Sequence, residues 1–143
     1  MRLQRSVTVD ASPEKVFAYL SDFTTTEEWD PGTVRCVRTS GDGGVGTAYL
    51  NTSKFLGRET ELTYTVLDVD HGRRVQLRGQ NKTVTATDTI KVSPNGSGSD
   101  VQYTADFEFK GVAKLVAPLL APAFKKLGDE AEQGMRDALS RLG

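Results

Sequence analysis

The stretch LVAPLLAPAFKKLGDEAEQGMRDALSRL, residues 115–142, decides the fold of this chain. Its apolar residues recur at steps of one, three and four, which is the pattern of a single stripe along an α-helix. The stripe comprises Leu115, Val116, Leu119, Leu120, Ala123, Phe124, Leu127, Ala131, Met135, Ala138, Leu139 and Leu142. Such a stripe needs an apolar surface to lie on, and almost everything before it reads as β-strand. We therefore expect a long helix across an antiparallel sheet, with apolar space for a pocket between them.

Two prolines, Pro118 and Pro122, interrupt this segment. A proline inside a helix removes a hydrogen bond and clashes with the preceding turn, at a cost of ~3 kcal/mol or more. The spacing predicts either a helix that bends or divides and leaves room over the sheet, or a helix that begins near Pro118 after a connecting segment. Five basic residues should form its solvated side, with contact to a membrane surface as the alternative: Lys114, Lys125, Lys126, Arg136 and Arg141.

Upstream, seven segments alternate apolar and polar residues as half-buried strands do. They cover residues 2–9, 33–39, 47–54, 58–70, 74–81, 83–93 and 100–110. Short turn-forming sequences join the last six, which predicts an antiparallel meander. After the first strand, Ser12 and Pro13 predict the start of a helix with Val16, Phe17 and Leu20 on its apolar face, and a second short helix should cover residues 24–28.

Length, charge and composition exclude several classes of protein. The chain has 143 residues, which predicts a single domain over residues 1–143, and its net charge of -1 gives no reason to expect nucleic acid as a partner. Because Cys36 is the only cysteine and His71 the only histidine, we expect no disulfide, no metal site and no cofactor. No apolar run approaches the ~20 residues of a membrane span. The N-terminus has no secretory signal pattern, so we expect a cytoplasmic monomer or weak homodimer without stable membrane insertion.

Asp88 is the candidate catalytic residue. It alternates in phase with Val84, Ala86 and Ile90, which should direct its side chain toward the apolar side of the sheet. A buried carboxylate must find a partner or raise its pKa, and a raised pKa suits a general acid or base. The alternative is a structural role, in which a tyrosine or an arginine such as Arg78 or Arg5 bonds to it.

The candidate ligand contacts combine aromatic and polar groups on the inner face. Tyrosines there could direct their hydroxyls at a ligand or simply pack in the core. Trp29 should lie at the mouth of the cavity, as a lid or as packing under the short helix. The full set is Trp29, Tyr49, Asn51, Tyr64, Leu77, Tyr103, Phe107, Leu119, Ala123, Phe124 and Leu127.

Several motifs occur in an order that resembles a known family. They are the opening strand with residues 10–17, Phe23-Thr24, residues 29–34, residues 43–47, residues 103–111 and the proline-interrupted helix. Over essentially the whole chain they resemble the START-like, helix-grip (SRPBCC) superfamily, in its polyketide cyclase/dehydrase branch. The resemblance implies an α+β helix-grip fold, in which a curved antiparallel sheet of about seven strands wraps around a long C-terminal helix. It also implies a small apolar or aromatic ligand.

Three functions follow as hypotheses. The first is a carrier, sensor or sequestering protein that binds a small hydrophobic or aromatic ligand between the sheet and the C-terminal helix. The alternative is an aromatase/cyclase or dehydratase acting on a polyketide-like substrate, with Asp88 as acid or base and Tyr64 and Tyr103 polarising carbonyl oxygens. The third is a protein-interaction module with a filled core. The enzyme requires Asp88 and a tyrosine in one open cavity, whereas an exposed apolar patch without a cavity would favour the interaction module.

Overall fold

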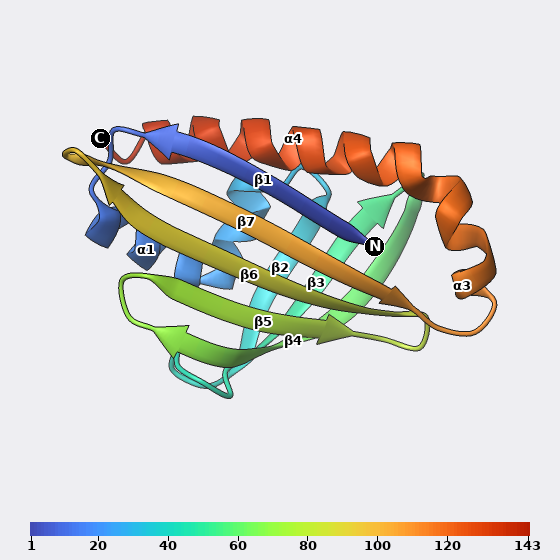
Figure 1. Cartoon of the computed structure of the whole chain (residues 1–143). Helices are drawn as coiled ribbons and strands as arrows, with labels where there is room; N and C mark the ends of the chain where they lie inside the picture. Colours follow the sequence, from blue (N-terminus) through green and yellow to red (C-terminus); the bar gives the residue numbers. More distant parts are fainter.

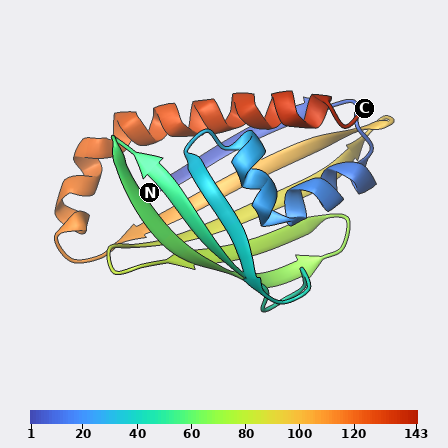
Figure 2. The same cartoon turned by 180° about the vertical axis from the view of Figure 1, so that it is seen from behind.

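Seven strands form one antiparallel sheet, and a long C-terminal helix lies across its open side (Figures 1 and 2). The structure is a computed structural model that describes residues 1–143. In chain order the elements are β1 (Arg2–Val9), α1 (Pro13–Ser21), the 3-10 helix η1 (Phe23–Thr25), α2 (Thr26–Trp29), β2 (Thr33–Ser40), β3 (Ala48–Phe55), β4 (Arg58–Asp70), β5 (Arg74–Gln80), β6 (Val84–Asn95), β7 (Gly98–Phe109), α3 (Ala113–Val116), the 3-10 helix η2 (Ala117–Leu120) and α4 (Ala121–Ser140).

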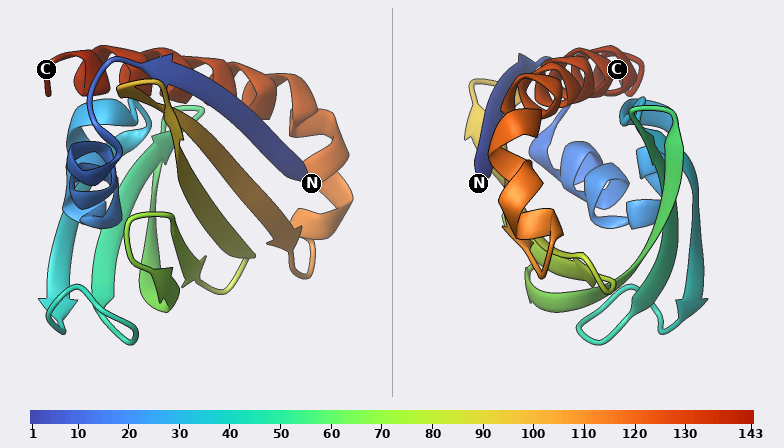
Figure 3. Two further views of the ribbon diagram at one scale, coloured as in Figure 1. Left: turned by 60° about the vertical axis from the view of Figure 1, so that its left-hand side comes forward. Right: turned by 90° about the vertical axis from the view of Figure 1, so that its right-hand side faces the viewer.

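The sheet order is β1-β7-β6-β5-β4-β3-β2, so the last six strands form the predicted meander and β1 returns to pair with β7. The ladder of β1 and β7 runs from Arg2 opposite Asp106 to Val9 opposite Ser99. Register shifts occur between β2 and β3 and between β4 and β5, where extra residues sharpen the curvature. Viewed end-on, the sheet curls into a half-barrel with α4 across the gap (Figure 3). The predicted α+β helix-grip fold is confirmed.

The connection between β1 and β2 fills one end of this half-barrel. The Ser12 hydroxyl accepts a hydrogen bond from the Lys15 amide at 3.4 Å and Pro13 occupies the first turn of α1, as predicted. Phe23 and Trp29 of the following two short helices are buried. Trp29 therefore lies in the interior, and the expectation that it stands at the mouth of the cavity is wrong. Its backbone carbonyl packs directly against Gly134 of α4, so the short helices come to rest beneath the long one.

The prolines divide the C-terminal segment into three parts, which agrees with the divided-helix alternative. Pro118 lies in η2 and Pro122 in the first turn of α4, where the missing N–H would have no partner in any case. The expectation of one continuous apolar stripe from Leu115 is wrong, because η2 breaks the phase of the helix. Leu115 and Leu119 face solvent, and the buried face of α4 consists instead of Phe124, Gly128, Ala131, Met135, Ala138 and Leu139.

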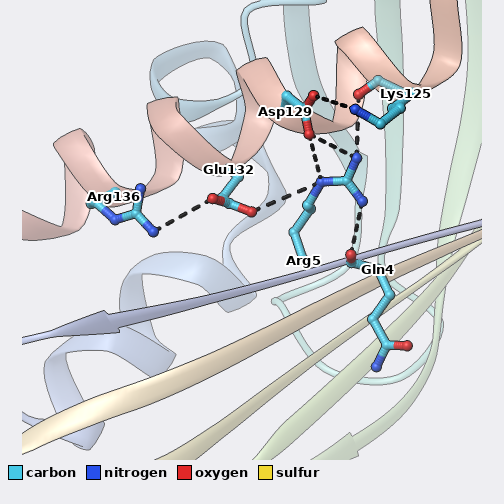
Figure 4. A network of polar contacts seen from close by, with 6 residues as sticks. All are labelled: Gln4, Arg5, Lys125, Asp129, Glu132 and Arg136. Carbon is cyan, nitrogen blue, oxygen red and sulfur yellow. Dashed lines mark hydrogen bonds and ion pairs between the residues drawn. The ribbon is translucent and has the colours of Figure 1, made fainter. Parts of the chain in front are cut away.

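Arg5 of β1 holds α4 over the edge of the sheet (Figure 4). Its Nε and Nη2 donate to Asp129 Oδ1 at 3.1 and 2.9 Å, and Nη2 also donates to the Lys125 carbonyl at 3.3 Å. Glu132 lies 3.8 Å from the same guanidinium. Gly128 gives the guanidinium room, since a Cβ there would lie 3.0 Å from Arg5 Nη2. Helix α4 thus contacts the β1 edge of the sheet through Arg5, and it contacts α2 on the other side of the half-barrel. In this way it closes the half-barrel.

Candidate ligand-binding cavity

A cavity of about 260 Å³ lies between the sheet and the α3–α4 segment. Its inner end is formed by residues from η1, α2 and the middle of the strands. Its outer end reaches the α3–η2 segment, where Ala113, Val116 and Leu120 line it opposite Lys54 and Thr60 of the β3–β4 hairpin. Lys54 is exposed, so this end meets solvent. The α3–η2 segment is at the end of the molecule that faces the viewer on the right of Figure 3.

Aromatic rings gathered around Phe124 of α4 form the apolar wall. The Phe124 ring lies 4.7 Å from Phe55, 5.2 Å from Phe107 and 5.6 Å from Phe109, measured between centroids. All four rings line the cavity. Phe55 and Phe109 were not among the predicted ligand contacts, although strand alternation carried the signal. Phe55 is in phase with Asn51, and Phe109 is in phase with Phe107.

The inner end carries an ionisable pair. Asp88 is 3% exposed, and its Oδ2 accepts a hydrogen bond from the Tyr103 hydroxyl at 2.9 Å. Burial raises the pKa of Asp88 to about 7, against the opposing effect of the Tyr103 hydrogen bond. The predicted alternative of a tyrosine partner is therefore correct. The arginine alternatives are wrong, because Arg78 faces solvent and Arg5 bonds to α4.

Tyr64 and Tyr103 are the two tyrosines that line the cavity, and packing fixes the positions of their rings. Burial holds the pKa of both hydroxyls well above its usual value. The Tyr64 ring lies over Gly79, its cross-strand partner, where a Cβ would stand 2.5 Å from the Tyr64 Cζ. The Tyr103 ring meets Trp29 edge-on at 5.5 Å. Trp29 Nε1 is buried without a hydrogen-bond acceptor, which leaves an unsatisfied donor in this wall.

Asp30 is a second carboxyl of the cavity lining, partly buried, that the sequence reasoning missed. Its Oδ1 accepts from the Gly32 amide and its Oδ2 from the Thr33 hydroxyl, both at 3.0 Å, and burial raises its pKa. In the sequence, Asp30-Pro31-Gly32 reads as an ordinary turn, and nothing local indicates that α4 covers it. Asp30 is hydrogen-bonded within its own loop, so among the lining carboxyls Asp88 is the one with an oxygen free for a ligand.

Eight of the predicted site residues line this cavity: Trp29, Asn51, Tyr64, Asp88, Tyr103, Phe107, Phe124 and Leu127. The other four do not. Tyr49 and Leu77 are buried in the core beside the cavity, and the Tyr49 hydroxyl has no partner. Ala123 lies outside the lining, and Leu119 is 79% exposed. Two phenols, rather than the three expected, therefore reach the cavity.

No group of three or more His, Cys, Asp or Glu side chains with the arrangement of a metal site occurs in the structure. None of its helices combines the length and the apolar content that crossing a bilayer requires.

Comparison with known proteins gives a consistent result for the fold. The family model described as polyketide cyclase / dehydrase and lipid transport matches residues 1–142. None of the curated proteins matches the sequence. Among solved structures, the Zhui aromatase/cyclase of Streptomyces sp. R1128 is similar with a TM-score of 0.83 at 14% identity, over 99% of this chain and 94% of that one.

Two further structures extend the comparison. A START superfamily protein of Mycobacterium smegmatis gives a TM-score of 0.79 at 17% identity, over 99% of both chains. A protein of Thermus thermophilus gives a TM-score of 0.81 at 14% identity, over 97% of both chains. At these identities the structures show a shared fold, and the family match covers nearly the entire sequence. The chain therefore belongs to the polyketide cyclase / dehydrase and lipid transport family.

Proposed function

We propose that the protein binds one small, largely apolar molecule in this cavity, with a ring system against Phe124 and a polar substituent at Asp88. The observation that carries the proposal is an aromatic-walled cavity whose inner end holds the Asp88–Tyr103 pair. Binding sites for small molecules are commonly apolar with a few polar groups that fix orientation. A cavity also argues against an interaction module with a filled core.

The volume limits the size of the ligand. An apolar cavity of ~150 Å³ holds one benzene ring, and pockets for drug-sized ligands begin near ~300 Å³. At about 260 Å³ the cavity suits a molecule of about two fused rings rather than a long flexible chain.

The inner end of the cavity also discriminates between ligands by their charge. No lysine, arginine or histidine is among the lining residues there, and Lys54 at the outer end is the only cationic residue of the lining. A ligand carboxylate placed beside Asp88 would meet like charge without a counter-ion. A hydroxyl or ketone instead finds a carboxyl that, with a pKa of about 7, both donates and accepts near neutral pH.

A matched series of probes tests the proposal by calorimetry: naphthalene, 2-naphthol and 2-naphthoate. We expect 2-naphthol to bind most tightly and 2-naphthoate least, with the difference between the last two growing above pH 7 as Asp88 ionises. Native mass spectrometry of freshly purified protein would in parallel reveal a retained ligand.

Ala105→Leu supplies the structural control, because Ala105 lines the cavity between Tyr103 and Phe107. The added side chain should fill the cavity and abolish 2-naphthol binding, whereas Ala18→Leu on the exposed side of α1 should not change it. Undiminished binding by a folded Ala105→Leu variant, or no binding of any of the three probes by the wild type, would contradict the proposal.

The second candidate function is an aromatase/cyclase or dehydratase, and the Asp88 environment favours it. A buried carboxyl with a pKa of about 7, beside a phenol in an open cavity, is suited to proton transfer at neutral pH. In a dehydration, neutral Asp88 gives its proton to the leaving hydroxyl, which departs as water. The resulting carboxylate, stabilised by Tyr103, takes the proton from the neighbouring carbon as the double bond forms.

A bicyclic β-hydroxyketone whose dehydration yields 1-naphthol tests this function by fluorescence. If Asp88 is catalytic, Asp88→Asn should lose turnover by roughly a hundredfold or more, a typical contribution of general acid–base catalysis, while 2-naphthol affinity changes much less. Tight binding of this compound by the wild type without conversion would leave the binding function alone.

A further inference from the structure

The α3–η2 segment presents apolar side chains both to the cavity and to solvent. Ala113, Val116 and Leu120 line the mouth of the cavity, although Val116 is also 47% exposed. Val112, Leu115 and Leu119 follow the same helical spacing and face solvent, with exposed fractions of 78%, 76% and 79%. A surface helix ordinarily presents polar residues outward, and a contiguous exposed apolar patch marks an interaction site. We call Val112, Leu115 and Leu119 the outer face.

The charges along this segment have one sign. Between residues 110 and 126 the chain has four lysines and no acidic residue, although its net charge is -1. Lys110 and Lys114 form no ion pair, and the Lys110 ammonium donates to the Asn81 carbonyl. In contrast, Lys125 pairs with Asp129 at 3.5 Å and Lys126 with Glu130 at 3.8 Å. Exposed ion pairs of this kind contribute little to stability. The outer face is thus bordered by cations.

The tip of the β3–β4 hairpin adds an apolar residue at the same end of the molecule. Phe55 stacks on Phe124 at the start of α4, which brings the hairpin beside the corner between η2 and α4 (Figure 2). The next residue, Leu56, is exposed and adopts a φ of 51°, in the left-handed region that glycine favours. A leucine at this position strains the backbone and exposes an apolar side chain to water. Its presence fits an apolar contact made outside the chain.

We propose that the outer face and Leu56 dock the protein on a lipid surface with anionic headgroups, with the mouth of the cavity turned toward the bilayer. Lysines near such a surface are attracted to its anionic lipids, and apolar side chains of a surface-bound helix reach the boundary of headgroups and acyl chains. Lysine is depleted in the core of protein–protein interfaces, and the outer face has none of the aromatic residues that are enriched there. In this orientation an apolar molecule passes between membrane and cavity without crossing water.

Vesicle co-sedimentation tests the proposal with the whole chain. We expect the wild type to sediment with vesicles of equimolar phosphatidylcholine and phosphatidylglycerol, and much less with phosphatidylcholine alone or at high salt. The double variant Leu115→Asp with Leu119→Asp should reduce the bound fraction at least tenfold, while its 2-naphthol affinity and thermal midpoint stay unchanged. Lys114→Glu should weaken binding to the anionic vesicles only.

The matched control changes two exposed valines on β2 and the β2–β3 loop, Val34→Asp with Val45→Asp. It introduces the same charges and should keep vesicle binding above that of the outer-face variant. The proposal fails if the wild type does not sediment with the anionic vesicles, or if both double variants lose binding equally. It also fails if light scattering shows a dimer that the outer-face variant abolishes, because the face would then pair two copies. Vesicle binding and 2-naphthol binding are separate readouts, so failure of one leaves the other standing.

Discussion

Asp88 is the residue at which burial and function conflict most directly. In the folded protein the Asp88 carboxyl has a pKa of about 7 and stays neutral below that pH. In the unfolded chain it ionises near the ordinary pKa of about 3.9. The raised pKa means that the folded state retains a proton that the unfolded state has lost. The contribution of Asp88 to stability therefore falls as the pH rises from about 4 to about 7, and it is constant above that range.

Asp88→Asn removes this term and keeps an acceptor for Tyr103. We expect its unfolding free energy, relative to the wild type, to rise across the window from about pH 4 to 7, by up to about 4 kcal/mol. Urea denaturation at several pH values measures the difference. A difference that does not change with pH would show that Asp88 ionises in the folded state as it does in the unfolded one.

Tyr103 sets the pKa of Asp88 from the opposite direction, because its hydroxyl donates to the carboxylate and favours the ionised form. Tyr103→Phe should raise the pKa of Asp88 further, as seen by carbon-detected NMR titration of the side-chain carboxyl. Tyr49→Phe is the matched control, since the Tyr49 hydroxyl is buried without a partner. It should leave the Asp88 titration in place and cost little stability. Equal shifts from both variants would contradict a direct effect of the hydrogen bond.

At the scale of elements, two glycines of α4 face neighbours that differ in rigidity. A Cβ at Gly134 would overlap the backbone carbonyl of Trp29, whereas one at Gly128 would meet the end of the Arg5 side chain at 3.0 Å. Alanine is the better helix former by about 1 kcal/mol at either position. Gly134→Ala must nevertheless push α2 and α4 apart, because a backbone neighbour cannot rotate away.

We expect Gly134→Ala to lower the unfolding free energy by about 1–3 kcal/mol, and Gly128→Ala to change it by less than about 1 kcal/mol in either direction. Denaturant titration of both variants gives the comparison. If the two substitutions have the same effect, close packing of α2 against α4 is not what positions Trp29.

The sequence was most informative where local geometry determines the result. Strand alternation placed Asp88, Tyr64 and Tyr103 on the inner face, and a divided helix was among the alternatives that the two prolines predicted. It failed where the answer depends on contacts between distant segments. The outward turn of Leu119 depends on the rotation that η2 introduces, and the burial of Trp29 depends on Gly134, about a hundred residues further along the chain. For the same reason, alternation could direct Asp88 inward but could not choose Tyr103 over an arginine as its partner.

At the scale of the whole molecule, α4 divides the interior along its length. Met135, Ala138 and Leu139 pack into the hydrophobic core beneath its C-terminal half. Phe124, Leu127 and Ala131 border the cavity beneath its N-terminal half. Side chains around a void lose the dispersion contacts that a filled core supplies. One end of the half-barrel is therefore well packed, and the end that receives the ligand is less so.

This division predicts a gradient of local stability that a ligand should reduce. Hydrogen exchange tracks local opening, which is easiest where few buried contacts hold the backbone. In the free protein we expect amides of residues 113–124 to exchange faster than those of residues 131–139, although the two segments belong to one helical region. Saturating 2-naphthol should slow exchange in the first segment and in Phe107, and leave the second nearly unchanged, as followed by mass spectrometry.

The Ala105→Leu variant should show slow exchange in the first segment without ligand, since its added side chain fills the same space. Uniform exchange along the whole region, or protection by 2-naphthol confined to residues 131–139, would mean that the ligand does not enter beneath the N-terminal half of α4.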